Sequence, residues 1–179
     1  MLRTPLCELL RIDAPILCAP FGPWDQVELA AAVCEAGGLG ALGTAAGSVP
    51  ELEAQWRTLR ERTAKPFAIN HQIRPFDEDA FEATLRFAPP AISFHMAVFP
   101  ELIERAHAAG SLWIQQVIDR RQAERALDAG ADVIVAQGGS GGSSRRTRST
   151  PSRSRTPSAC CRPTTARAAP PTRARCERR

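Results

Sequence analysis

The sequence contains few of the residue patterns that identify a metal site, a redox dithiol or a membrane segment. Its six cysteines include no pair with the CxxC spacing, and its three histidines have no metal-ligand spacing. Neither a zinc site nor a redox-active dithiol is therefore indicated. The amino terminus has no apolar signal-peptide core, and no apolar run approaches the length of a membrane span. We expect a soluble protein of the reducing cytoplasm without a membrane partner.

Large apolar residues are missing from the last part of the chain. After residue 144 there is no Leu, Ile, Val, Phe or Trp, and eleven Arg accompany a single acid, Glu177. The first 144 residues carry a net charge of −6 and the remainder carries +10, which together give the +4 of the whole chain. Only the first part has the residues for a hydrophobic core. We therefore divide the 179 residues into a folded part, 1–139, and a disordered tail rich in Arg, Ser, Thr and Pro, 140–179.

Within the folded part, strand-like and helix-like segments alternate. Short apolar runs predict strands at residues 14–18, 39–43, 65–70, 91–94, 112–117 and 133–136. Capping boxes, Asp25 with Glu28 and Ser48 with Glu51, predict the starts of two helices. Further helices are expected over 77–87, from Pro100 to the glycine at 110, and over 119–129. This alternation predicts a parallel α/β sheet with right-handed crossovers.

Two architectures are compatible with this order of elements: an open doubly wound sheet and most of a (β/α)8 barrel. A doubly wound dinucleotide-binding domain needs the motif GxGxxG after its first strand. Residues 19–24 instead read Ala-Pro-Phe-Gly-Pro-Trp. The spacing of the elements alone leaves the choice between the two architectures open.

Several segments taken together carry a family resemblance. They are TPLCELL at 4–10, APILCAPFG at 14–22, ELAAAV at 28–33, AGGLGALG at 36–43, FAIN at 67–70, PAISFH at 90–95 and DAGADVIVAQG at 128–138. In this combination the chain resembles the nitronate monooxygenases, also called 2-nitropropane dioxygenases, over residues 4–139. The resemblance implies an FMN-dependent TIM barrel, here truncated after about six β units, that oxidises alkyl nitronates with O2. An FMN-dependent enoyl-ACP reductase of the same fold stays open as the alternative.

The resemblance also implies a flavin-binding loop after the first predicted strand. In the family this loop lies against the flavin, which assigns Ala19, Pro20, Phe21 and Gly22 to cofactor binding. A glycine in this loop lets the backbone approach the ring closely. Without the resemblance, the same residues are interpreted as a Pro-Gly turn.

Neutral amide side chains stand at the ends of three other predicted strands. Asn70 ends the third strand, and Gln137 and Gly138 follow the sixth. Gln115 and Gln116 end the fifth strand, where alternation lets only one of them face the barrel axis. Amides donate to and accept from the edge of a flavin without altering its charge. The resemblance therefore assigns Asn70, Gln116, Gln137 and Gly138 to FMN binding.

We assign no catalytic residue. The family's base for the α-proton of the substrate is a His in the motif AQGxEAGGH, and the aligned segment here reads AQGGSGGSS. Ser140 stands in place of the Glu and Ser144 in place of the His. Because a serine hydroxyl is a poor proton acceptor near neutral pH, we expect proton abstraction to be affected more than oxidation of a preformed nitronate. His95 follows the fourth strand, and a lone His is more often a hydrogen-bonded packing residue.

The strand pattern stops before a barrel would be complete. A TIM barrel needs about 250 residues and eight strands, and the family's phosphate-binding loops after the last two strands have no counterpart here. We therefore expect impaired activity on the expected partners, a small nitronate and O2.

The change of character after residue 139 has two interpretations. One is a reading-frame change inside the family motif, which we favour because the change does not fall at a domain boundary. The other is a genuine basic tail whose arginines bind nucleic acid on an otherwise non-catalytic fragment. No aromatic residue stands between the arginines to stack on bases, so nucleic acid is the disfavoured partner.

Overall fold

The structure is a computed structural model that describes residues 2–20, 26–72, 75–95 and 97–138. Its elements are, in order, α1 (Pro5–Leu10), α2 (Val27–Glu35), β1 (Gly40–Gly43), α3 (Val49–Arg62), β2 (Phe67–His71), α4 (Glu78–Phe87), β3 (Ala91–His95), α5 (Pro100–Ala108), β4 (Leu112–Val117), α6 (Arg120–Asp128) and β5 (Val133–Ala136). The predicted tail, 140–179, lies outside the described residues. No helix in the described ranges is long and apolar enough to cross a membrane.

The five strands form one parallel sheet in the order of the sequence. β1 pairs with β2, β2 with β3, β3 with β4, and β4 with β5. A doubly wound sheet reverses its strand order at a switch point, whereas a barrel adds each strand to the same side of the last one. The structure therefore has the barrel type of winding, and the predicted α/β barrel class is confirmed.

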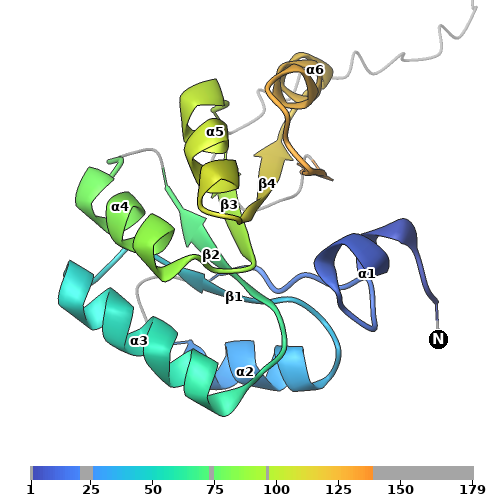
Figure 1. Ribbon diagram of the computed structural model, residues 1–179. Helices are drawn as coiled ribbons and strands as arrows, with labels where there is room; N and C mark the ends of the chain where they lie inside the picture. Colours follow the sequence, from blue (N-terminus) through green and yellow to red (C-terminus); the bar gives the residue numbers. More distant parts are fainter. Residues whose placement is uncertain (1, 21–25, 73–74, 96, 139–179) are drawn as a thin grey trace, which may run out of the picture. The chain divides into compact units, whose positions relative to one another are not determined.

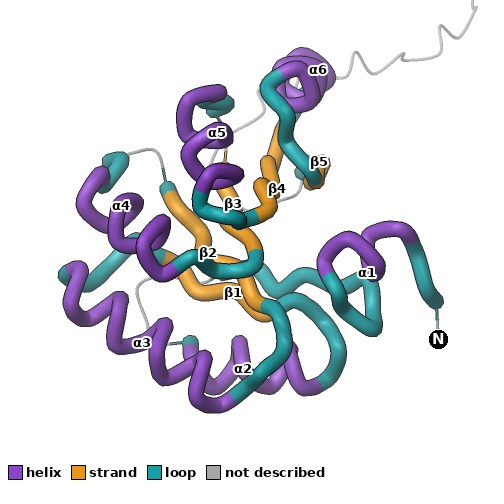
Figure 2. The backbone as a smooth tube through the Cα atoms, in the orientation of Figure 1, coloured by secondary structure: helices purple, strands orange, loops and turns teal. Residues whose placement is uncertain are grey.

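Helices cover one face of the sheet, which we call the outer face. Figures 1 and 2 show α2 to α6 following one another along this face, with α1 on the other side. Apolar side chains that alternate along each strand pack under these helices: Leu42, Phe67, Ile69, Ile92, Phe94 and Trp113. The opposite, inner face carries three alanines and one isoleucine, which pack against α1 and the residues that follow it: Ala41, Ala68, Ala91 and Ile114.

The prediction of a strand at residues 14–18 is wrong. This segment contributes only an isolated parallel bridge between Leu17 and Leu39. Leu39 N–H donates to the Ile16 carbonyl over 2.9 Å, and Cys18 N–H donates to the Leu39 carbonyl over 2.8 Å. The bridge does not extend backwards because Pro15 has no N–H and the Ile16 N–H donates to Ala14 within a turn. The bridge at Leu17 lies where a further parallel strand would pair with the start of β1, but residues 14–18 form no strand.

Two helix starts differ from the prediction. Helix α1 was not predicted, although Thr4 stands at its N-cap and Pro5 occupies its first turn, a position that proline favours. Asp25, the predicted cap of α2, lies outside the described residues, and Gln26 is at the N-cap. The capping box of α3 is confirmed, because the Ser48 N–H donates to the Glu51 carboxylate over 2.7 Å.

Helix α2 lies very close to β1, and one glycine allows this. A Cβ atom on Gly40 would lie 2.3 Å from the Ala30 carbonyl oxygen and 2.7 Å from the Cys34 sulfur. No non-bonded carbon tolerates such distances, so only glycine fits at this position. The close contact fixes α2 against the outer face at the first strand.

Candidate functional site at the carboxyl ends of the strands

A cavity of about 210 Å³ opens on the inner face of the sheet, toward the carboxyl ends of the strands. Most of its wall is small or apolar, from Leu17, Ala19, Pro20, Leu39, Ala41, Ala68, Ile114 and Val135. Phe94, whose side chain packs in the core of the outer face, also borders the cavity. Polar groups enter from Cys18, Asn70, Ser93 and Gln116. Burial raises the pKa of the Cys18 thiol, which makes it a neutral lining group at neutral pH. In parallel α/β proteins this end of the strands is where ligands bind.

Asn70 is held in the cavity wall by a neighbouring strand. Its side-chain N–H groups donate to the Ser93 carbonyl over 3.2 Å and to the Ser93 hydroxyl oxygen over 2.9 Å. Asn70 and Ser93 are paired in the register of β2 and β3, so the two side chains meet directly. Both amide hydrogens are thus used, and the amide oxygen has no partner among the described residues. It is an acceptor available to a ligand N–H.

A second polar group joins the ends of β3, β4 and β5. The Gln116 amide donates to the Gln137 side-chain oxygen over 2.9 Å. His95 Nε2 lies 3.1 Å from the same Gln137 oxygen. We call these three side chains the rim network. It links the cavity wall at Gln116 to a histidine and to the residue that follows β5.

The two neighbouring glutamines of β4 face opposite sides. Gln116 lies on the inner face, whereas Gln115 is fully buried on the outer face. Gln115 accepts from the Trp113 indole N–H over 3.1 Å and donates to the Ala97 carbonyl over 3.3 Å. Gln115 is therefore a satisfied core residue, and Gln116 is the one that a ligand can reach.

The loop assigned from the family resemblance is described only in part. Ala19 and Pro20 line the cavity, whereas Phe21 and Gly22 lie outside the described residues. Gly138 follows Gln137 and is exposed, with open space around the position of a Cβ atom. Ser140 and Ser144, where the family motif has Glu and His, also fall outside the described residues.

Ser93 was missed by sequence reasoning. The alternation of Ile92 and Phe94 toward the core places Ser93 on the other face, which is a signal that the sequence contains. The small residues of the floor, Ala41 and Ala68, were missed in the same way. They matter because their small side chains leave the space that forms the cavity.

His71 is the other histidine near the strand ends, and it lies on the outer face. Its Nε2 is 2.9 Å from the Thr84 hydroxyl, and its Nδ1 is 3.2 Å from the Thr44 hydroxyl. Burial lowers the pKa of His71 to about 3, although Asp77 opposes the shift by its charge. His71 is therefore neutral at neutral pH and holds β2 to α4.

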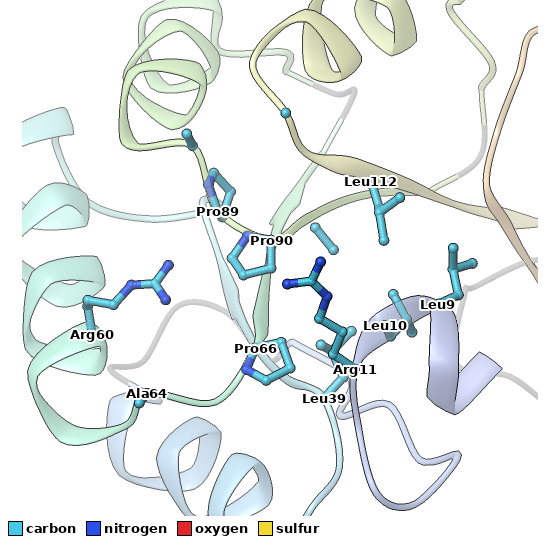
Figure 3. Close-up of a pocket in the computed structure, with 13 residues that line it drawn as sticks. Leu9, Leu10, Arg11, Leu39, Arg60, Ala64, Pro66, Pro89, Pro90 and Leu112 are labelled. Carbon is cyan, nitrogen blue, oxygen red and sulfur yellow. The ribbon is translucent and has the colours of Figure 1, made fainter. Parts of the chain in front are cut away.

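A larger cavity of about 560 Å³ lies at the opposite, amino ends of the strands (Figure 3). It is lined by prolines and leucines together with Arg11 and Arg60. The Arg60 guanidinium stacks on Phe67 at 4.6 Å, which gives it a packing role. Arg11 is the C-cap residue of α1 and has the left-handed conformation, with φ of 55°. The amino ends of such sheets serve stability rather than chemistry.

The chemistry of the upper cavity follows from its lining. Neutral amides and one hydroxyl offer donors and acceptors, and no Lys, Arg or His is among the described residues that line it. Such a wall suits a flat, uncharged ring with polar edges and gives no counter-charge to a phosphate. Within the described residues no group of three or more His, Cys, Asp or Glu could hold a metal ion.

Comparison with known sequences gives one family and several relatives. The family model described as nitronate monooxygenase matches residues 3–80. A (3aS,4S,5R,7aS)-5-hydroxy-7a-methyl-1-oxo-octahydro-1H-indene-4-carboxyl-CoA dehydrogenase of Mycobacterium tuberculosis is 34% identical over 142 residues, covering 79% of this chain and 40% of that protein. A nitronate monooxygenase of Paraburkholderia phytofirmans is 31% identical over 176 residues, covering 76% of this chain and 48% of the relative. The chain thus spans half or less of the length of these two relatives.

Solved structures share the fold of the described part. FabK from Thermotoga maritima superposes with a TM-score of 0.74 at 32% identity, covering 77% of this chain and 45% of that chain. A nitroalkane oxidase from Streptomyces ansochromogenes gives a TM-score of 0.66 at 28% identity, covering 75% of this chain and 49% of the other.

Proposed function

Because residues 3–80 match the family model described as nitronate monooxygenase, we propose that the protein is a flavin-dependent oxidoreductase that binds FMN and oxidises alkyl nitronates with O2. The observation that carries the proposal is the cavity at the carboxyl ends of the strands, with Asn70 and Gln116 in its wall. The likeness to a nitronate monooxygenase and to a nitroalkane oxidase supports the same substrate class. Because this chain spans less than half of the length of those two proteins, their activities have to be tested on this chain itself.

The cavity lining fits the ring of FMN better than its phosphate. The free amide oxygens of Asn70 and Gln116 are acceptors for a ring N–H, and the alanines and Ile114 give an apolar surface for the ring face. When bound, FMN would take electrons from the nitronate and pass them to O2. The described part of the lining contributes no cation for the phosphate, so we expect weak FMN binding.

The residues of the site have distinct parts in this function. Ser93 fixes the orientation of Asn70 by accepting both of its amide hydrogens. Gln137, which follows β5, fixes Gln116 by accepting one hydrogen bond from its amide. The apolar floor excludes water from the reacting atoms.

A second candidate function is oxidation or reduction of a thioester substrate. Two relatives at 34% identity, from Mycobacterium tuberculosis and Rhodococcus jostii, are named as carboxyl-CoA dehydrogenases. Their identity to this chain is slightly above that of the nitronate monooxygenase, 31%. This candidate shares the flavin and the cavity with the first one and differs in substrate.

The test uses the full 179-residue chain with added FMN. We expect quenching of FMN fluorescence on titration, an altered flavin absorption spectrum, and O2 uptake with ethyl nitronate. Asn70→Ala should weaken FMN binding by about tenfold, which corresponds to one lost hydrogen bond of about 1.4 kcal/mol. Gln72→Ala, an exposed amide outside the cavity, is the matched control.

The outcomes separate the candidates. Flavin uptake with turnover of a CoA thioester and no O2 uptake on nitronate would favour the second function. A chain that is folded but leaves FMN fluorescence unchanged at millimolar concentration would contradict both.

A further inference from the structure

His95 lies beside the candidate site, and only one of its two ring nitrogens has a hydrogen-bond partner among the described residues. His95 ends β3 and is paired in register with Gln116, which lines the cavity. It lies on the same face as Ser93, two residues earlier, which also lines the cavity. His95 is half-buried, so part of its surface is exposed to solvent.

The rim network determines which nitrogen of His95 carries the hydrogen. The Gln137 side-chain oxygen is an acceptor only, and it already accepts from the Gln116 amide over 2.9 Å. His95 Nε2 lies 3.1 Å from that oxygen, so Nε2 must be the donor. The neutral ring then has its lone pair on Nδ1. Nδ1 has no partner among the described residues.

The other two histidines do not offer this arrangement. His71 is buried, and both of its ring nitrogens contact threonine hydroxyls. His107 is exposed and bonds the Asp132 carboxylate over 2.9 Å, away from the residues that line the cavity. Among the chain's three histidines, His95 alone combines an unused nitrogen with a place at the cavity rim.

We propose that His95 is a catalytic proton acceptor that converts a neutral nitroalkane into its nitronate, an inference that rests on the proposed function and adds a substrate to it. The Nδ1 lone pair takes the proton from the carbon beside the nitro group. The electrons of the broken C–H bond form the C=N bond of the nitronate, and the negative charge passes to the nitro oxygens. The ring becomes an imidazolium, whose Nε2–H continues to donate to Gln137.

Gln137 and Gln116 are positioning residues in this step. The Gln137 side-chain oxygen accepts the hydrogen bond from Nε2 and so fixes the tautomer and the orientation of the ring. The bond from Gln116 in turn keeps the Gln137 oxygen, rather than its NH2 group, directed at His95.

Deuterium exchange tests the step without any flavin. The full chain, free of FMN, is incubated with nitroethane in D2O, and the loss of the CH2 signal is followed by proton NMR. His95→Gln should slow the protein-dependent exchange about 100-fold, at the lower end of what a positioned base contributes. The matched control, His107→Gln, removes an exposed histidine and should exchange at the rate of the unchanged chain.

Three results of this assay would overturn the proposal. They are an unchanged exchange rate in His95→Gln, an equal loss in His107→Gln, and exchange by the unchanged chain no faster than by the same concentration of free imidazole. Because no cofactor takes part, a chain that binds no FMN but exchanges through His95 would contradict the proposed function and leave this inference standing.

A second measurement keeps the proposal testable if His95→Gln does not fold. Histidine-selective nitrogen NMR of the unchanged chain should show His95 as the Nε2–H tautomer. Gln137→Leu removes the acceptor and should shift the ring toward a mixture of tautomers. A His95 ring found with its hydrogen on Nδ1 would overturn the proposal, because that nitrogen then has no lone pair to take a proton.

Discussion

Gln116 and Gln137 are joined by a 2.9 Å hydrogen bond between their side-chain amides, although 21 residues separate them in the sequence. The bond connects the inner face of β4 to the residue just after β5. It is also one of the two bonds that the Gln137 oxygen accepts, the other coming from His95. The last described strand is thereby tied to the site by side chains as well as by its backbone.

Removing this shared acceptor should weaken both the fold and the site. Gln137→Leu leaves the Gln116 amide and the His95 N–H without their acceptor, and we expect a loss of about 1 to 2 kcal/mol in the free energy of unfolding. FMN affinity should fall as well, because Gln116 loses its fixed orientation. Urea denaturation and FMN fluorescence titration measure the two effects. Gln72→Leu is the control, and equal behaviour of both variants would contradict the role of the bond.

The buried His71 should make the protein sensitive to acid. Its pKa is about 3 when folded and near 6.5 when unfolded, so the unfolded state binds more protons between these values. The stabilising effect is complete above about pH 6.5 and is lost as the pH falls toward 3. We expect a loss of about 2 kcal/mol between pH 7 and pH 5 from this group.

Urea denaturation at several pH values measures this effect. His71→Gln removes the titrating group, so its free energy of unfolding should change less between pH 7 and pH 5 than that of the unchanged chain. His107→Gln should keep the full dependence. An identical pH dependence in His71→Gln would show that the loss comes from other groups.

Gly40 should tolerate no side chain. In Gly40→Ala the new Cβ meets the Ala30 carbonyl, so α2 must move away from β1, and we expect a cost of about 3 kcal/mol or more. Gly138→Ala is the matched control, because nothing lies within 4 Å of its Cβ position. Thermal unfolding followed by circular dichroism compares the two, and equal midpoints would contradict the close packing.

Trp56 and Trp113, both fully buried, should respond differently to the same change. The Trp56 indole N–H is buried without a partner among the described residues, whereas the Trp113 indole N–H donates to Gln115 over 3.1 Å. Trp56→Phe removes an unsatisfied donor, while Trp113→Phe leaves the buried Gln115 oxygen unpaired. We expect Trp113→Phe to destabilise by about 1 to 3 kcal/mol more than Trp56→Phe in urea denaturation.

Most strands and helices could be predicted from the sequence because their signals are local. The segment Leu112–Val117 shows why: alternation within six residues separates Gln116 from Gln115, and the structure places them on opposite faces. The run at residues 14–18 misled because its apolar residues match a strand, whereas Pro15 and the turn at Ala14 and Ile16 remove the hydrogen bonds that a strand needs. A hydrophobic pattern alone does not show whether the backbone N–H groups of a segment are available for pairing with a neighbouring strand.

The site could be predicted only in outline. Asn70 and Gln116 were located because each lies near the carboxyl end of a strand, and whether they bind a flavin stays a prediction. The contact of His95 with Gln137 spans 42 residues and depends on how three strands align. No pattern within one segment indicates such a contact, so His95 could be interpreted only as a lone histidine.

The sequential order of the strands also has a consequence for how the protein acquires its fold. Each strand pairs with the one made just before it: Gly40 pairs with Phe67, Ala68 with Ala91, and Ile114 with Val133. Partners therefore stand only 19 to 27 residues apart, so little loop-closure entropy opposes each pairing. During synthesis, the strand with which a new strand pairs has already left the ribosome, so the pairing does not depend on residues made later. We expect stalled ribosome-bound chains that expose β1 to β3 to protect the β2 amides from hydrogen exchange before β4 is made.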